Sequence, residues 1–409
     1  MKFRIILFLG LALSMIGCDT TDDIKSSSER PSLSVYRFDS AQHVLKIAVN
    51  PATEWTIAGE YSWCKPDQLS GKGNDSLTIR IEANVTTQER TMRLFITEME
   101  ARQSIQIIQA GSSSEYHYKL PVIFHILYNN AASTSENVTG ERIYQTISDC
   151  NEFYKNSNKS VDMNLEFVPA THDPTGKLLA EPGIERIHRE PSIVMDCWQF
   201  MGNEEFVPYL WDLNQYINIF IYTFSNKNVT GISHMPYSIG RNGLSGLYNG
   251  SYFLIDPTLD YPHCLSMNNI FMQTQHSGLK MPDATLTFTH EMGHYLGLFH
   301  VFMEGNTVTD YCDDTETYDR AAYDDWLKTL SGEVSFGKLV KRTSPEGYGF
   351  ISYNIMDYDY SYLNQFTPDQ RKRVRYVLEN SPLIPGPKTT GSRTRSDMSM
   401  EKPKARAIE

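Results

Sequence analysis

Apolar and polar residues alternate along three runs in the first quarter of the chain, at residues 77–85, 91–99 and 104–111. A period of two is typical of strands that bury one face. Turn-rich stretches such as LSGKGND (69–75) separate the runs. This pattern predicts an all-β sandwich over residues 31–110.

A different pattern follows the Gly/Ser-rich residues 111–115, which we expect to form a flexible linker. Long β-branched and aromatic runs predict strands, a proline-free run predicts one helix, and a run that Thr367-Pro368 can start predicts another. The runs lie at 118–130, 217–224 and 252–257 (strands) and at 284–296 and 368–378 (helices). We expect an α+β domain at 116–380 with a mixed sheet, and a disordered tail at 381–409, where prolines and charges dominate.

The first residues combine a short basic segment with an apolar run that is too short to span a bilayer. We expect a signal peptide at 1–17, lipid modification at Cys18 and an acidic, polar tether at 18–30. An ordinary signal peptide followed by an incidental cysteine is the alternative. The DTTDD segment resembles export tags of Bacteroidetes surface lipoproteins, which implies an outer-membrane lipoprotein exposed at the cell surface. Anchoring in the leaflet that faces the periplasm is the alternative location.

The net charge of −12 argues against nucleic acid as a partner, because phosphate binding needs concentrated Lys and Arg. It does not identify a substrate.

The sequence HEMGHYLGLFH at 290–300 contains the residues of a metal site. On a helix, His290 and His294 project from one face and can bind one zinc ion. Gly297 can turn the chain so that His300 becomes the third ligand. Three ligands leave one position for a water, from which Glu291 can take a proton. Asp283 is the expected N-cap of this helix.

The motif, followed by NIMDY at 354–358, resembles the metzincin metallopeptidases. The resemblance implies that Met356 lies beneath the metal and that Tyr358 ligates zinc or hydrogen-bonds the tetrahedral intermediate. Ordinary core packing of the methionine and an exposed turn tyrosine are the plainer readings. Residues 116–380 are most similar to the pappalysin, or cytophagalysin-like, group. This similarity places the edge strand at 252–257 and a C-terminal helix after the methionine turn.

Residues 31–110 resemble the BACON domain, an Ig-like β-sandwich. The resemblance rests on Trp55, on the WC-x-P step at 63–66 and on the closing IIQAG. Carbohydrate binding and a spacer role are both open, and the tryptophans are the core residues of this pattern. Cys64 in WCKPD resembles a thiol latency switch, whereas the sandwich pattern predicts a buried thiol.

The acidic loop after the motif matches a calcium-binding stretch of the same family only in part. Asp310, Asp314 and Thr315 are its candidate ligands for Ca²⁺, and a solvated acidic loop explains them equally well. Five cysteines follow Cys18. The pairs 150 with 197 and 264 with 312 are expectations only, because spacing does not determine connectivity.

Together these features predict a zinc-dependent endopeptidase that hydrolyses extracellular proteins or glycoproteins, with Glu291 as general base. One alternative is a surface lipoprotein that binds glycan or protein through an inactive peptidase fold. The other is a zinc amidase that acts on cell-wall peptides.

Overall fold

The computed structural model describes residues 33–49, 53–59, 63–72, 76–98, 101–155, 160–238, 243–249, 259–273, 283–305, 307–358, 360–388 and 406–409. The expected signal peptide at 1–17, Cys18, the tether at 18–30 and the strand at 252–257 lie outside these residues. No helix in the described ranges is long and apolar enough to cross a membrane.

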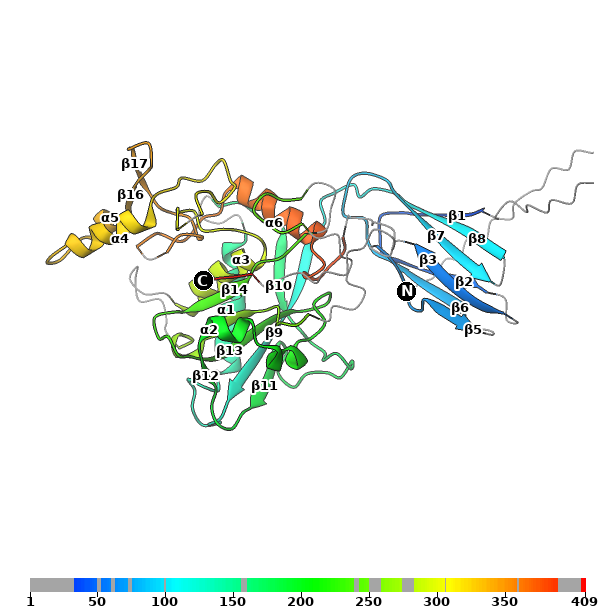
Figure 1. The fold of residues 1–409 in the computed structure, drawn as a ribbon, viewed down its shortest axis with the longest axis horizontal. Coiled ribbons are helices and arrows are strands. Elements are labelled where there is room, and N and C mark those ends of the chain that lie inside the picture. Colours follow the sequence, from blue (N-terminus) through cyan, green and yellow to red (C-terminus); the bar gives the residue numbers. More distant parts are fainter. Residues whose placement is uncertain are drawn as a thin grey trace, which may run out of the picture.

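The first domain is a sandwich of two sheets (Figure 1). One sheet has the order β1-β8-β7-β3-β5, with the bounds Leu33–Phe38, Ala101–Gln109, Arg90–Glu98, Glu54–Gly59 and Ser70–Lys72. The other has the order β2-β6-β4, with the bounds His43–Ala48, Ser76–Ile81 and Cys64–Pro66. β1 is parallel to β8, and the other pairs are antiparallel.

The sandwich core forms as the alternation predicts. On β6, Leu77, Ile79 and Ile81 are fully buried, while the residues between them are more exposed. Trp55 and Trp63 are buried in the same core. The all-β sandwich is therefore present, and both tryptophans serve its interior.

The second domain is built on a mixed sheet with the strand order β10-β9-β13-β15-β14-β18. The bounds are Leu165–Pro169, Tyr118–Tyr128, Ile217–Phe224, Leu265–Asn268, Gly231–His234 and Ala407–Ile408. β11 (Ile184–His188) follows β10 along the edge of β9, and β12 (Val194–Met195) pairs with β13. Strands β10, β9, β13 and β15 are parallel, whereas β14 and β18 are antiparallel to their neighbours. β9 and β13 are buried along most of their length, as is typical of parallel strands covered on both faces.

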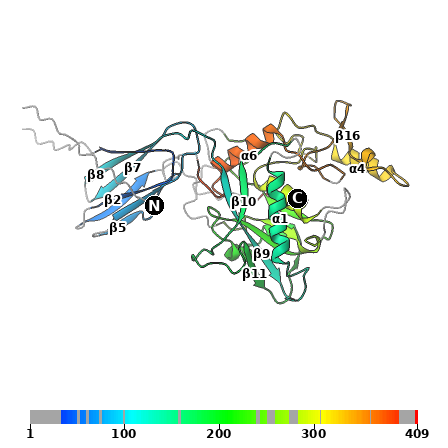
Figure 2. The same cartoon turned by 180° about the vertical axis from the view of Figure 1, so that it is seen from behind.

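Three long helices complete this domain, and side-chain caps start each of them. They are α1 (Gly140–Phe153), α3 (Ala284–Tyr295) and α6 (Pro368–Asn380). The Thr367 side chain and Gln370 form a capping box at α6, and Pro368 occupies its first turn, where no N–H is needed. α1 and α3 pack together (Figure 2). The predicted α+β class is therefore observed.

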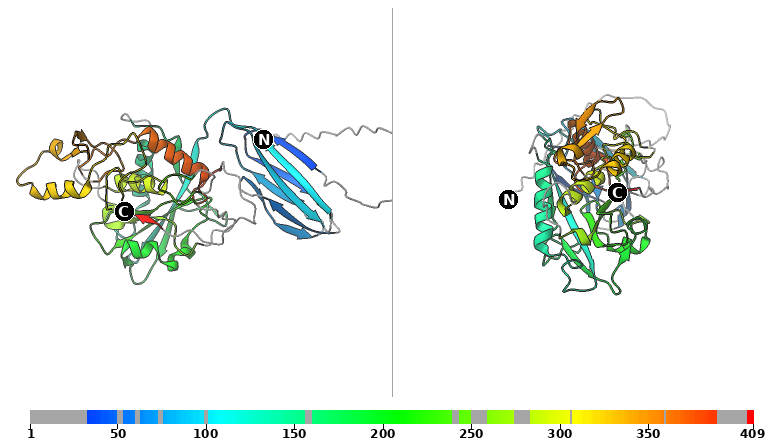
Figure 3. Two further views of the ribbon diagram at one scale, coloured as in Figure 1. Left: turned by 45° about the horizontal axis from the view of Figure 1, so that its top comes forward. Right: turned by 90° about the vertical axis from the view of Figure 1, so that its left-hand side faces the viewer.

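Residues 320–351 form a separate lobe far from the sandwich (Figures 1 and 3). It contains α4 (Arg320–Thr329), α5 (Phe336–Leu339) and the hairpin of β16 (Lys341–Thr343) with β17 (Gly349–Ile351). Short helices elsewhere are α2 (Cys197–Met201), η1 (Glu204–Tyr209) and η2 (Asn269–Phe271).

The described parts of the expected disordered tail are packed, so that expectation was wrong for residues 381–388 and 406–409. Leu383 and Ile384 are fully buried. The backbone carbonyl of Lys388 accepts a bond from Arg90 of the sandwich at 2.7 Å, and its Nζ donates to the Leu378 carbonyl at 2.9 Å. This short segment therefore lies between the two domains, and its few apolar residues find partners that composition did not reveal.

The linker is also tied down at its end. The Glu115 carboxylate accepts bonds from Arg371 on α6 and from Asn164. The expectation of a flexible joint at 111–115 was therefore wrong at Glu115.

Candidate metal centre and catalytic site

Helix α3 begins and ends where the sequence predicted. The Asp283 side chain accepts the Leu286 N–H at 2.7 Å and caps the first turn. After Tyr295 the chain turns at Gly297, whose φ is +91°. The Gly297 N–H donates to the His294 carbonyl and the Leu298 N–H to the Gly293 carbonyl, both at 2.9 Å, which is a Schellman motif. This turn returns the chain toward α3 and brings His300 to its histidines.

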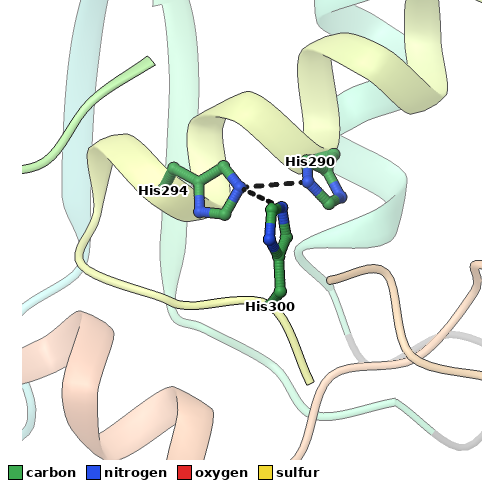
Figure 4. Close-up of side chains that lie close together, drawn as sticks. All are labelled: His290, His294 and His300. Atoms are coloured by element: carbon green, nitrogen blue, oxygen red, sulfur yellow. Dashed lines mark hydrogen bonds between the residues drawn. The ribbon is translucent and has the colours of Figure 1, made fainter. Parts of the chain in front are cut away.

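The three histidines of the motif meet at one point (Figure 4). The Nε2 atom of His294 lies 3.0 Å from Nε2 of His290 and 3.0 Å from Nε2 of His300. Within the described part of the chain, they are the one group of His, Cys, Asp or Glu residues with metal-site spacing.

Backbone carbonyls orient two of these rings. Nδ1–H of His290 donates to the Ile355 carbonyl and Nδ1–H of His294 to the Leu298 carbonyl, each at 2.8 Å. A neutral imidazole whose proton is on Nδ1 presents a lone pair at Nε2. Lone pairs that face each other at 3.0 Å repel unless a cation lies between them, so this donor set fits a metal ion.

Burial keeps these rings neutral. It lowers the pKa of His290 to about 4 and that of His294 and His300 well below the ordinary value of 6.5. The proximity of the other histidines lowers the pKa of His294 and His300 further. Neutral imidazoles are the form that binds metals.

Glu291 lies beside the triad with part of its carboxylate unpaired. The side chain is buried, and its Oε2 atom has no hydrogen-bond partner in the described structure. Burial raises its pKa well above 4.5, and Glu409 adds to this effect. A buried carboxylate oxygen without a partner is costly, and a metal-bound water is a natural donor for it.

The edge strand β14 leaves room for this carboxylate. A Cβ at Gly231 would lie 2.7 Å from Cγ and 2.9 Å from Oε1 of Glu291. Only a glycine therefore fits at this position opposite α3, and no sequence signal had marked it.

The turn at 354–358 packs against the same helix. Met356 is fully buried, and its sulfur occupies the space that a side chain at Gly293 would need. The Asn354 side chain accepts the Met356 N–H at 2.9 Å and exchanges two bonds with Gln370 of α6. α6 therefore holds the turn under the helix that carries two of the histidines.

The Tyr358 ring lies next to the triad, with its centroid 4.6 Å from that of His300 and 5.8 Å from that of His290. Its hydroxyl donates to the backbone carbonyl of Glu409 at 2.5 Å. Burial raises the pKa of this phenol far above its usual value of 10, so it is a donor at neutral pH.

A buried network that the sequence did not suggest supports this tyrosine. The Asp357 carboxylate pairs with Arg342 at 3.3 Å and accepts bonds from Tyr318 at 2.6 Å and from Ser352. Both side chains of the ion pair are fully buried. The network joins the α4–β17 lobe to the turn, and its one sequence signal was an acidic residue between Met356 and Tyr358.

The three candidate calcium ligands have hydrogen-bond partners within the protein. Asp310 accepts a bond from the Thr315 hydroxyl at 2.8 Å, whereas Asp314 accepts the Asp369 N–H at the start of α6. These contacts explain the residues as loop and helix caps.

All five described cysteines are free and buried, so the two expected disulfides are not formed. Cys150 and Cys197 belong to separate apolar clusters. Cys64 lies within the sandwich core, and burial raises the pKa of its thiol, which is unlike an accessible, metal-binding thiol.

Two segments of the chain match family models. Residues 53–110 match the BACON family, described as a putative binding domain, N-terminal, and residues 263–379 match the M43 peptidase family, described as pregnancy-associated plasma protein-A. The resemblance to these two families is therefore confirmed for the matched segments.

Two curated proteins are similar to parts of this chain. An extracellular metalloprotease of Arthroderma benhamiae is 39% identical over 90 residues, which are 22% of this chain and 29% of that protein. A xyloglucan-specific endo-β-1,4-glucanase of Bacteroides ovatus is 31% identical over 99 residues, which are 24% of this chain and 19% of that protein. The chain thus spans less than a third of the length of these curated relatives.

Among solved structures, mature mirolysin of Tannerella forsythia in complex with a cleaved peptide is 21% identical. The match covers 65% of this chain and 93% of that one, with a TM-score of 0.46.

Proposed function

We propose that this chain, which contains an M43 peptidase segment at 263–379, is a zinc-dependent endopeptidase. One observation carries the proposal. The Nε2 atoms of His290, His294 and His300 converge beside the buried, partly unpaired carboxylate of Glu291. Three imidazoles with one open position are the ligand set of a hydrolytic zinc site.

The residues divide the chemistry among them. His290, His294 and His300 would hold the zinc ion, which when bound polarises a carbonyl and lowers the pKa of water. Glu291 takes the proton from the attacking water and delivers it to the leaving amine. The Tyr358 hydroxyl donates to the oxygen that becomes negative in the transition state. Met356 gives the triad an apolar floor.

A polypeptide substrate would pair with β14 on the side that β18 occupies in this structure, and β14 faces α3 at Gly231. Backbone pairing there orients an extended peptide toward the triad. The edge strand that the resemblance places at 252–257 lies outside the described residues and stays an expectation.

We further propose that Cys18 anchors the enzyme to the outer membrane and that it acts on extracellular proteins or glycoproteins. The Arthroderma relative is named as extracellular, which supports action outside the cell. Incorporation of labelled palmitate would test the anchor, and Cys18→Ala should abolish it. Surface exposure would be tested by adding protease to intact cells, which should remove the protein.

For the sandwich we favour a spacer role over carbohydrate binding. Trp55 and Trp63 are buried, so neither presents a face on which a sugar ring could stack. Calcium binding at Asp310, Asp314 and Thr315 stays an expectation from the sequence. It is tested by removing metals with a chelator, restoring zinc, and measuring casein cleavage with and without added calcium.

The inactive binding protein is disfavoured, because every residue of the motif is in place. A cell-wall amidase would use the same site and is separated from an endopeptidase by substrate.

The test measures hydrolysis of casein and of purified cell-wall peptide by the full chain. Glu291→Gln is the variant. Glu152→Gln, on the exposed face of α1, is its matched control. We expect casein cleavage that a chelator abolishes and zinc restores. Removal of Glu291 should slow it by about 10²–10⁴-fold. Casein cleavage that is unchanged by the variant and by the chelator would refute the proposal. Cleavage of cell-wall peptide alone would establish the amidase.

A further inference from the structure

The edge of β14 is already occupied by another segment of the chain. Residues 406–409 return to the second domain, and β18 pairs antiparallel with β14, with Ile408 opposite Ser233 and Ala407 opposite His234 (Figures 1 and 3, red). The Met235 N–H donates to the Arg406 carbonyl at 2.7 Å. The segment therefore lies where an extended peptide would bind.

Side chains of this segment also contact the domain. Ile408 packs against the main apolar core, and Ala407 against a second cluster that contains Cys197 and Phe200. Alternate residues of a strand face opposite sides, so both faces of the segment are in use. The Arg406 guanidinium donates to the Gly246 carbonyl at 2.7 Å and lies over the Phe299 ring.

The next residue reaches the candidate catalytic groups. The Glu409 carbonyl accepts the Tyr358 hydroxyl at 2.5 Å and a bond from His300. The Glu409 carboxylate accepts a bond from Nε1–H of Trp198 at 3.2 Å. The main-chain oxygen of Glu409 therefore lies beside His300 and Tyr358, next to the three histidines.

From these contacts we infer that residues 406–409 are an autoinhibitory segment that occupies the peptide-binding edge in the manner of a substrate. The inference rests on the proposed function, because it takes this edge to be the site of the substrate peptide. A substrate and the segment cannot pair with β14 at the same time, so the segment competes with every peptide.

The segment is suited to reversible inhibition. It forms only a two-residue strand, and burial, with the nearby Glu304 and Asp196 carboxylates, raises the pKa of the Glu409 side chain. Such a ligand binds weakly as a free peptide. The segment belongs to the same chain as the domain it contacts, and covalent connection of this kind can give effective concentrations of about millimolar. A substrate at sufficient concentration can still displace it.

The test measures binding, so it does not depend on turnover. Three zinc-loaded proteins would carry Glu291→Gln: the full chain, a form without residues 402–409, and a control in which residues 390–397 become Gly and Ser. The probe is a fluorescein-labelled peptide of sequence Gly-Gly-Arg-Ala-Ile-Glu, followed by fluorescence anisotropy. We expect the truncated form to bind at least about tenfold more tightly than the other two. Equal affinity for all three, or no binding to any of them, would overturn the inference.

Hydrogen exchange gives a second readout. The Met235 amide should be protected in the full chain and in the Gly/Ser control, and it should exchange faster in the truncated form. Unchanged exchange there would contradict the pairing. The same truncation is also made with Glu291 intact. If that protein does not cleave casein, while the truncated Glu291→Gln form binds the peptide more tightly than the full chain, the proposed hydrolysis is refuted and the autoinhibitory segment stands.

Discussion

Gly231 on β14 faces Glu291 on α3 so closely that a methyl group at Gly231 would lie 2.7 Å from Cγ of the glutamate. The carboxylate is thus positioned from two sides, by its own helix and by the edge of the sheet.

Gly231→Ala should therefore displace Glu291. A shift on the order of 1 Å in a catalytic group can cost about 10²-fold in rate, so we expect kcat on casein to fall by that order while zinc content is kept. Gly202→Ala is the matched control, because no heavy atom lies within 4 Å of the added Cβ. Equal loss in both variants would show that the close contact has no special role.

Tyr358→Phe should lower kcat at saturating substrate by about 10–10³-fold, because it removes one donor to the developing oxyanion. Zinc affinity should change little, since the three histidines stay in place. Tyr348→Phe, at an exposed position of the β16–β17 hairpin, is the control. A loss of bound zinc in Tyr358→Phe would instead assign the phenol to the metal.

Asp357→Asn should destabilise the protein by about 3–5 kcal/mol, because it leaves Arg342 buried without its counter-charge. Urea unfolding measures this change. Asp325→Asn breaks an exposed pair with Lys328 and should cost less than about 1 kcal/mol. A similar loss in the free energy of unfolding for both variants would mean that the buried ion pair stabilises the protein no more than the exposed pair does.

His263 should make stability depend on pH. Both of its ring nitrogens are buried and have no hydrogen-bond partner among the residues that the structure describes, and burial, with the nearby His234, lowers its pKa well below 6.5. The unfolded chain then binds a proton that the folded chain does not, so the free energy of unfolding falls as pH drops below about 6.5. His263→Phe should flatten this slope relative to wild type, and the exposed His188→Gln should not. Parallel slopes for wild type and His263→Phe would contradict the assignment.

The metal-binding motif was predictable because its signals are local. Helical spacing places His290 beside His294, Asp283 caps the helix, and a left-handed residue at Gly297 ends it. Each of these depends on neighbours within a few residues, and the structure confirms the cap and the turn.

The features that were missed depend on contacts between distant residues. The need for glycine at position 231 arises from the packing of β14 against α3. The role of Arg342 arises from its ion pair with Asp357, which is distant in the sequence. The pairing of residues 406–409 with β14 could not be predicted from the local sequence, because two residues of ordinary β-propensity do not indicate a strand. Composition alone therefore suggested a solvated tail.

The segment between the domains bears on how the protein can be divided. Val85 of the sandwich belongs to the apolar core of the second domain, the Tyr118 hydroxyl donates to the Pro387 carbonyl, and Arg90 holds Lys388. A fragment that begins at residue 116 would uncover this joint face to water and lose part of its own core. The sandwich therefore supplies part of the packing of the second domain, and the two are best kept together when the protein is divided for study.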